Sequence, residues 1–437
     1  MNKQNKYISV ENIPFDIKRD TIFDIKTKSV NYLTHSFHKY PGKFIPQIPD
    51  WAINKYTSKN NLSILDPFCG SGTTLVESLL HNHNAIGIDI DPLSVLISKV
   101  KTTPLDIEKL TIIKNWVTDK IKDKNIKQRK IPKIKTLNHW FTDDAIDKLG
   151  KIRFIIDEIP NNFSDTKDIQ DFLYICFSSI IRKVSNADNQ SQKTYVSHTN
   201  PKIPDEVFSS FSKQLELYFV EIIEFSKKIK NVKAEIINNS STIDLKTLLN
   251  DKVIDLIITS PPYIKAIDYI YNQMVELFWI GDLFDIETQE KQNERKKSYV
   301  GNKQLKKSEY AKFIPKKYKT NFILLDSSIQ KIFETDKKNG HKHSYITWKF
   351  FNDMENHFKE ISSVMRPKVH YVMVVGNSKV SNIEIDTANI LIEIAKKYNL
   401  NISNKWGYKI KNRYMRFDRK GRGGKINIDW VLDFEKE

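Results

Sequence analysis

The stretch Leu65-Asp66-Pro67-Phe68-Cys69-Gly70-Ser71-Gly72-Thr73-Thr74 follows a short apolar run and leads into a helical pattern at residues 73–82. It predicts a strand, a glycine-rich turn and a helix in succession. In such a turn the backbone N–H groups and the amino end of the helix face a ligand, and glycine lets that ligand approach the main chain. The stretch is therefore a predicted binding loop.

The residues around this loop narrow the choice of ligand. A phosphate-binding P-loop needs a lysine after its last glycine, but Thr73 follows Gly72. A dinucleotide-binding loop wants a third glycine near Leu75, and none is present. A second apolar run, residues 84–91, contains Gly87-Ile88-Asp89. It places a carboxylate where both ribose hydroxyls of an adenosine could donate hydrogen bonds to it.

A second motif, Thr259-Ser260-Pro261-Pro262-Tyr263, closes an apolar run that begins at residue 253. Two prolines cannot continue a sheet ladder, so the chain must turn there with little freedom. One group that such a rigid turn could hold is the exocyclic amine of a nucleobase. This amine is a poor nucleophile because its lone pair is delocalised into the ring. Acceptors aimed at its hydrogens, such as the Ser260 hydroxyl and the Pro261 carbonyl, would favour a tetrahedral nitrogen. Tyr263 could stack on a base that has flipped out of the duplex.

Together, D-P-F-x-G-S-G-T-T, G-I-D and S-P-P-Y resemble the motifs of the amino-methylating (N4-cytosine/N6-adenine) DNA methyltransferases. The resemblance covers roughly residues 31–100 and 235–437, and it implies S-adenosyl-L-methionine as the cofactor. In that family the acid at position 66 helps hold the methionine portion, and the acid at position 89 holds the ribose. The catalytic candidates are Ser260, Pro261, Pro262 and Tyr263. The cofactor-binding candidates in the loop region are Asp66, Pro67, Phe68, Cys69, Gly70, Ser71, Gly72, Thr73, Thr74 and Asp89.

An upstream element also resembles the family. His38, Pro41 and Lys43 match an H-x-x-P-x-K pattern, which implies that they help bind the methionine end of the cofactor. From the residues alone, a solvated turn remains open. The strand before the catalytic motif usually ends in Gly-Asp, whereas residues 237–241 read Ile-Asn-Asn-Ser-Ser, so a cofactor role there also stays open.

The alternation of apolar runs and helical patterns predicts an α/β fold. The resemblance makes it a Rossmann-like methyltransferase, with a doubly wound, mostly parallel, seven-stranded sheet and a helical insert. Residues 1–30 form an N-terminal extension without a readable pattern. Residues 31–104 are the cofactor-binding half of the catalytic domain, and residues 105–234 are a mainly helical insert that could recognise the target. Residues 235–437 are the catalytic half, which includes a basic insert at residues 283–345.

The charge balance favours a polyanionic partner, with 70 Lys and Arg against 53 Asp and Glu and a net charge of +17. A chain rich in Lys, Asn and Ile can also arise from an AT-rich genome. Clustering is more informative, because residues 291–319 hold eleven Lys and Arg against two Glu, with aromatic residues between them. This pattern predicts a surface that binds double-stranded DNA, and a solvated lysine loop is the alternative. The DNA-binding candidates are Lys296, Lys297, Lys306 and Lys307.

The remaining composition argues against several other classes. The two cysteines, Cys69 and Cys176, are too few for a disulfide framework and lack zinc-ligand spacing, so no metal site is expected. No apolar run approaches the roughly 18 residues of a membrane span, and the amino terminus lacks the apolar core of a signal peptide. We expect a cytoplasmic protein without a membrane partner.

The predicted function is sequence-specific DNA methylation at N4 of cytosine, because the serine form of the catalytic motif is commonest among N4-cytosine enzymes of the family. N6-adenine methylation is the main alternative, since it uses the same amine chemistry. An RNA or protein amide substrate and a non-catalytic DNA-binding protein are lesser alternatives. Cytosine C5 methylation is excluded because no Pro-Cys pair supplies its nucleophile. The biological setting we expect is restriction–modification or defence, with any restriction endonuclease on a separate polypeptide.

Overall fold

The computed structural model describes residues 7–26, 29–159, 166–188, 193–264, 268–302, 305–411 and 426–437. Within these ranges the strands form one nine-stranded sheet of order β1-β2-β10-β11-β7-β6-β3-β4-β5 and a small β8-β9 pair. In that order, the strands of the main sheet are Ile8–Val10, Ile22–Ile25, Leu400–Lys409, Ile428–Lys436, His370–Gly376, Leu256–Thr259, Ser63–Asp66, Asn84–Asp89 and Ala234–Asn238. β8 spans Ser378–Val380 and β9 spans Ile383–Ile385. β11 is antiparallel to both of its neighbours, and every other pairing in the main sheet is parallel.

The sheet is the expected doubly wound, mostly parallel one, but it holds two strands more than the predicted seven. The additional strands are β1 and β2, from the segment for which no pattern was readable. β2 pairs in parallel with β10, and β1 pairs with β2 at the edge of the sheet. Strands of three and four residues at an edge bury only part of their side chains, so they show little hydrophobic alternation.

Both faces of the central strands are buried, as a doubly wound fold requires. Ile64, Leu256 and Ile258 pack on one face against helix α1, Gln47–Tyr56. Leu65 and Ile257 pack on the other face, in the same cluster as residues of α15 and α16. The remaining helices on the sheet side are η1 Leu33–Ser36, α2 Thr73–Leu80, α3 Pro92–Thr102, α9 Leu245–Leu249, α14 Ile323–Thr335, α15 Gly340–Val364 and α16 Thr387–Lys396.

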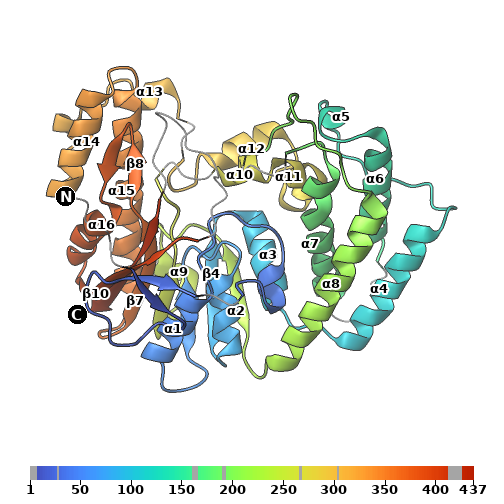
Figure 1. Cartoon of the computed structure of the whole chain (residues 1–437), viewed down its shortest axis with the longest axis horizontal. Helices are drawn as coiled ribbons and strands as arrows, with labels where there is room; N and C mark the ends of the chain where they lie inside the picture. Colours follow the sequence, from blue (N-terminus) through green and yellow to red (C-terminus); the bar gives the residue numbers. More distant parts are fainter. Residues whose placement is uncertain are drawn as a thin grey trace.

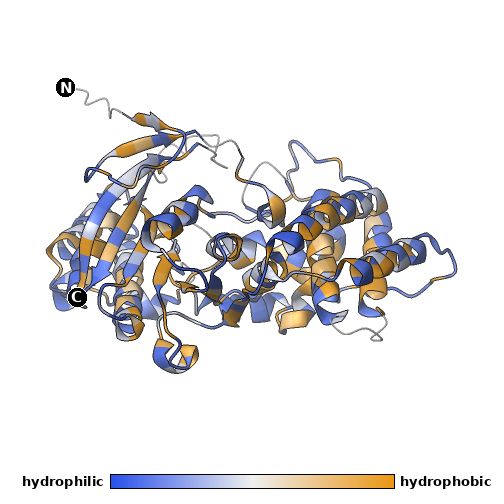
Figure 2. Cartoon of the chain, turned by 90° about the horizontal axis from the view of Figure 1, so that it is seen from below, coloured by the Kyte–Doolittle hydropathy of each residue, from blue (hydrophilic) through white to orange (hydrophobic). Residues whose placement is uncertain are grey.

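The helices α4 to α8, which lie between α3 and β5 in the chain, gather on the right of Figure 1, away from the strands β7 and β10. They are α4 Ile107–Lys122, α5 Leu137–Trp140, α6 Asp143–Asp157, α7 Thr166–Val184 and α8 Val207–Lys228. Their apolar residues share one core with α2, α3 and α11, Met274–Ile280. Hydrophobic residues, coloured orange, lie along the sides where these helices pack, and hydrophilic residues, coloured blue, lie outside (Figure 2).

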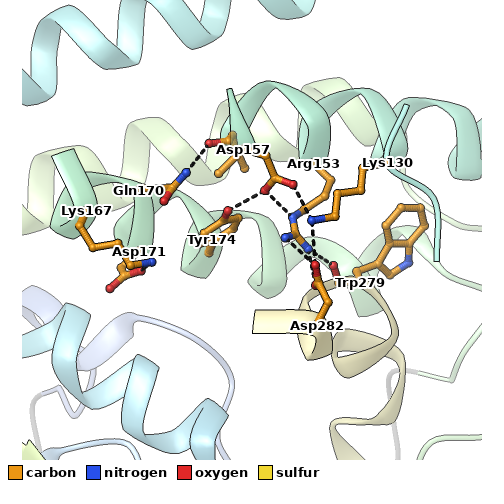
Figure 3. A network of polar contacts seen from close by, with 10 residues as sticks. Lys130, Arg153, Asp157, Lys167, Gln170, Asp171, Tyr174, Trp279 and Asp282 are labelled. Atoms are coloured by element: carbon orange, nitrogen blue, oxygen red, sulfur yellow. Dashed lines mark hydrogen bonds and ion pairs between the residues drawn. The ribbon is translucent and has the colours of Figure 1, made fainter. Parts of the chain in front are cut away.

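An ionic network around the buried Arg153 fastens this helical region to the segment that follows the catalytic motif (Figure 3). Arg153 of α6 is 1% exposed and pairs with Asp157 at 2.9 Å and with Asp282 at 2.8 Å. Its guanidinium also donates to the backbone oxygen of Trp279 at 2.6 Å. Lys130 bridges the same two carboxylates at 2.7 Å each. Because Trp279 belongs to α11 and Asp282 to η2, Gly281–Phe284, the network joins distant parts of the chain.

The region between η2 and α14 contains short helices: α12 Gln289–Lys296, α13 Lys307–Tyr310 and η3 Pro315–Lys317. The short helix α10, Tyr269–Asn272, precedes α11. In the part of the chain that the structure describes, no helix combines the length and the apolar character needed to cross a membrane.

Candidate active site

The glycine turn joins the end of β3 at Asp66 to the start of α2 at Thr73. Gly70 and Gly72 have φ values of +49° and +78°, in the left-handed region that favours glycine. A Cβ on Gly70 would lie 3.1 Å from the Tyr40 ring, and one on Gly72 would lie 3.2 Å from the Cα of Ser98. Both glycines are therefore required by backbone conformation and by space.

Asp66 lies beneath this turn. Its Oδ1 accepts hydrogen bonds from the Thr259 hydroxyl at 2.5 Å and from the Phe68 backbone at 3.1 Å. Burial raises the pKa of Asp66 to about 6, against the opposing effect of these hydrogen bonds. Thr259 is the last residue of β6, so Asp66 links the carboxyl ends of the two central strands. This link brings the glycine turn and the catalytic motif together.

Asp89 ends β4 beside the turn. One carboxylate oxygen accepts from the Gly70 backbone N–H at 2.8 Å, and the other accepts from the Asp91 N–H at 2.8 Å. Burial, followed by the charge of Asp91, raises the pKa of Asp89 to about 7. Asp91 itself begins α3 as its N-cap, accepting from Leu93 and Ser94. The pair forms an acidic wall at the end of β4.

A pocket of about 740 Å³, including its opening to solvent, lies over the carboxyl ends of β3, β4, β5 and β6. This position is the point where strand order reverses, which is where doubly wound folds bind ligands. The candidate residues that line it are Lys43, Pro67, Phe68, Cys69, Gly70, Ser71, Thr73, Asp89, Ser260 and Pro262. The candidate residues outside the lining are His38, Pro41, Asp66, Gly72, Thr74, Pro261 and Tyr263.

The pocket also contains residues that the sequence motifs did not indicate. Tyr40, Asp91 and Tyr269 line it, as do the residues from Asn239 to Ser241 and from Ser298 to Val300. The sequence left a cofactor role open for residues 237–241, and Asn239–Ser241 lines the pocket because it directly follows β5, at the carboxyl ends of the parallel strands, where ligands bind as a rule. The Ser298–Val300 segment belongs to the basic insert, where no such rule applies.

The upstream element divides between the pocket and the helical region. The His38 ring contacts the Ser178 hydroxyl at 3.0 Å, and its backbone N–H donates to the Tyr218 hydroxyl at 2.7 Å. Burial lowers the pKa of His38 to about 4, so its ring is neutral at pH 7. Lys43 lines the pocket and donates to the backbone oxygen of His35 at 3.0 Å. The structure thus places His38 in packing against α7 and α8.

The catalytic motif has two sides. Ser260 and Pro262 face the pocket, whereas Tyr263 lies toward β7 and β11. The Tyr263 hydroxyl donates to Oδ1 of Asp429 at 2.7 Å, and burial raises the pKa of Asp429 to about 6. A Cβ on Gly376 would lie 3.0 Å from the Tyr263 ring, so the ring rests closely against β7. The tyrosine is fixed at both its edge and its hydroxyl.

The four lysines proposed to bind DNA differ in their exposure to solvent. Lys296 is 5% exposed, and its ammonium group lies 3.7 Å from the Asp268 carboxylate. Lys297, Lys306 and Lys307 are exposed. A buried, paired lysine is poorly placed to meet phosphate, so the structure leaves the three exposed lysines as candidates for DNA contact.

The pocket fits the cofactor that the motifs imply. The hydroxyls of Ser71 and Ser241 are buried in its wall and have no hydrogen-bond partner among the described residues. Leaving a buried polar group unpaired costs about 1–3 kcal/mol, so such groups are expected where a ligand completes them. The glycine turn offers close backbone approach, and Asp89 offers a carboxylate. These features suit a zwitterionic amino acid joined to an adenosine.

Comparisons with known proteins agree with this chemistry. The family described as DNA methylase, of the N6/N4 methyltransferase kind, matches residues 2–99. The Type II methyltransferase M.MvaI of Kocuria varians is 30% identical over 408 residues, which cover 88% of this chain and 85% of that protein. M.MjaII of Methanocaldococcus jannaschii is 29% identical over 63% of this chain and 68% of its own length. M.BsoBI of Geobacillus stearothermophilus is 25% identical over 57% and 53%, respectively.

The first of these relatives matches most of the chain and most of its own length. The glycine turn, the acid at the end of β4 and the S-P-P-Y turn lie around one pocket. The chain therefore belongs to the amino-methylating DNA methyltransferases, as a Type II enzyme that acts on DNA with S-adenosylmethionine as methyl donor.

Proposed function

We propose that the enzyme methylates the exocyclic N4 amine of cytosine within a specific sequence of double-stranded DNA. The observation that carries the proposal is that Ser260 and Pro262 line the same pocket as Gly70 and Asp89. They do so because β6 pairs directly with β3. An amine held at this turn lies next to the pocket that suits the methyl donor.

The proposed chemistry needs no side-chain nucleophile. The Ser260 hydroxyl and the Pro261 carbonyl would accept hydrogen bonds from the two amine hydrogens, which favours a tetrahedral nitrogen whose lone pair can attack the methyl group. As the N–C bond forms, the bond between the methyl group and the donor's sulfur breaks, a neutral thioether leaves, and the methylated amine loses one proton to solvent. A rigid turn suits this task because the acceptors need no reorganisation during the reaction. The cofactor supplies an activated methyl group, and the Asp66–Thr259 contact keeps the turn in register with the glycine loop.

Tyr263 is proposed to stack on the extrahelical base. Flipping a base costs a few kcal/mol, and an aromatic platform recovers part of that cost. Asp429 supports this role because it holds the Tyr263 hydroxyl at 2.7 Å. The base would then lie on the β7 and β11 side of the turn, with the cofactor on the β3 and β4 side.

The choice of cytosine rests on the serine in the S-P-P-Y motif, the form commonest among N4-cytosine enzymes of the family. N6-adenine methylation remains the second candidate, because a Ser260 hydroxyl and a backbone carbonyl could hold either amine. A sequence-specific enzyme of this kind is also expected to protect sites from a restriction endonuclease, which we propose is a separate polypeptide.

Mass spectrometry of digested DNA, methylated by the purified enzyme, tests the proposal. We expect N4-methylcytosine in the product of the wild type and a reduction on the order of a hundredfold in Ser260→Ala. The control for Ser260→Ala is its S-adenosylmethionine affinity, which should stay near the wild-type value. Product containing only N6-methyladenine would overturn the base assignment. Undiminished turnover in Ser260→Ala would overturn the catalytic assignment of the turn.

A further inference from the structure

The basic insert reaches into the pocket that holds the cofactor. Ser298, Tyr299 and Val300 follow α12 directly and line the pocket together with Asp89 and Asp91. Resemblance to the family gave these residues no role, because they lie within an insert that was considered only for DNA binding. Their position requires a second function for the start of this insert.

Arg295 fastens the insert to the sheet at this point. Its Nη2 donates to the backbone oxygen of Ile90 at 2.8 Å and to Oδ1 of Asn238 at 3.1 Å. Ile90 follows Asp89 and lines the pocket, and Asn238 is the last residue of β5. The guanidinium thus bridges the carboxyl ends of two neighbouring strands, which is a task suited to its planar, multiple-donor geometry.

Lys296 fastens the same turn on another side. Its ammonium group lies 3.7 Å from Asp268, the residue before Tyr269 in the pocket wall. It also lies 5.6 Å from the centroid of the Tyr271 ring. Two consecutive cations therefore anchor the end of α12 to two different segments beside the pocket, and the residues that follow line it.

Tyr299 is the aromatic residue that these contacts position. It is partly buried and packs against the apolar core shared by α3 and the helical region. Burial and then the charge of Asp91 raise its pKa far above the ordinary tyrosine value, so its hydroxyl remains protonated and can donate. A fixed ring with a protonated hydroxyl, next to the carboxylates of Asp89 and Asp91, suits contact with a nucleoside.

We propose that Tyr299 is a cofactor-binding residue and that Arg295 is a positioning residue that holds it. The bound cofactor and the folded conformation of this part of the basic insert would then stabilise each other. This inference rests on the proposed use of the pocket by S-adenosylmethionine. Because linkage is reciprocal, a cofactor that stabilises residues 289–302 is itself bound more tightly when those residues are in place. Lys306 and Lys307 follow in the same insert, which connects cofactor binding to the proposed DNA surface.

Calorimetric titration with S-adenosylmethionine tests the role of Tyr299. We expect Tyr299→Ala to weaken binding about tenfold or more, the scale of losing one aromatic contact to a base, and Tyr299→Phe to lose less. Tyr310→Ala is the matched control from the same insert, outside the pocket lining, and should bind as the wild type does. Wild-type affinity in Tyr299→Ala would overturn the inference. Failure of the wild-type protein to bind would instead overturn the pocket assignment.

Hydrogen exchange, followed by mass spectrometry, tests the role of Arg295 without measuring activity. In the wild type, S-adenosylmethionine should slow exchange across residues 289–302. In Arg295→Ala that protection should shrink, with a severalfold loss of affinity, while Arg366→Ala, which breaks an ion pair with Asp255, should retain both. Equal melting temperatures of the cofactor-free variants would establish that folding is intact. Undiminished protection in Arg295→Ala would overturn the positioning role.

Discussion

The helical region and the cofactor pocket differ in whether the buried polar groups described above have partners within the protein. Around Arg153 the charges and their partners are matched, since Asp157, Asp282 and the Trp279 carbonyl surround the guanidinium (Figure 3). In the pocket the Ser71 and Ser241 hydroxyls are left without a partner within the described parts of the chain. The difference indicates that the Arg153 contacts specify how the helices dock, whereas the two pocket serines keep hydrogen-bonding capacity for a ligand.

The largest expected effect comes from breaking the matched network. Arg153→Ala removes the buried cation and leaves the partly exposed Lys130 as the cation shared by Asp157 and Asp282, so we expect the free energy of unfolding to fall by about 3 kcal/mol. Arg129→Ala is the control, because Arg129 forms a comparable pair with the 58% exposed Asp147 and should cost no more than about 1 kcal/mol. Urea denaturation measures both. Equal losses would show that burial of the network does not matter.

The pocket should respond in binding more than in stability. Asp89→Ala removes the carboxylate proposed to hold the ribose, and we expect S-adenosylmethionine binding to weaken by about 1.5–3 kcal/mol. Asp255→Ala is the control, because Asp255 accepts hydrogen bonds from Ser63 and Arg366 at the amino ends of β3 and β6, whereas the pocket lies at their carboxyl ends. Calorimetry on both variants decides. An affinity in Asp89→Ala equal to that of the control would remove the ribose assignment.

The same carboxylate predicts a dependence of stability on pH. Burial raises the Asp89 pKa from 3.8 to about 7, so the folded, cofactor-free protein binds this proton more tightly than the unfolded chain does. Its stability should therefore fall as pH rises from about 4 to about 7. Asp89→Asn lacks this titration. The free energy of unfolding of this variant should therefore rise relative to that of the wild type by on the order of 1–3 kcal/mol as the pH goes from 5 to 8. Thermal unfolding at both pH values measures the gain, and a difference that stays constant with pH would contradict it.

The exposed charges form a third class with the smallest expected effect on folding. Replacing Lys297, Lys306 and Lys307 with alanine should change the free energy of unfolding by no more than about 0.5 kcal/mol for each residue. The logarithm of DNA affinity should also fall less steeply with the logarithm of salt concentration. Each phosphate contact contributes about −0.9 to that slope, so losing up to three contacts should make it shallower by up to about 2.7. Alanines at Lys227, Lys228 and Lys230, exposed at the carboxyl end of α8, are the matched control. Identical salt slopes in both variants would favour a solvated lysine loop.

The features that were predictable from sequence are those with local causes. The glycine turn needs left-handed backbone at Gly70 and Gly72, and the double proline ends β6, so short stretches specify both. The order of strands around them follows from the family resemblance. The position of the site at the carboxyl ends of β3 and β6 then follows from the topology.

The features that were not predictable depend on distant partners. His38 contacts Ser178 and Tyr218, which lie 140 and 180 residues away in sequence, and nothing local indicates that its ring faces the helical region. Lys296 belongs to a basic run, yet Asp268 draws it into the interior. Tyr299 lines the pocket, and Arg295, four residues before it, contacts Ile90 and Asn238 at the ends of β4 and β5. The charge pattern of a sequence identifies its cations. It does not distinguish the cations that pair within the protein from those that are exposed and could contact DNA.

The placement of Cys69 in the pocket wall has a consequence for oxidative stress. Its thiol is 4% exposed, and burial together with the nearby Asp89 charge holds its pKa well above the usual value. Peroxides and alkylating agents react with the thiolate, which is scarce under these conditions. A sulfur atom next to the glycine turn is therefore protected without a disulfide, and oxidants should reach it only when the pocket itself opens.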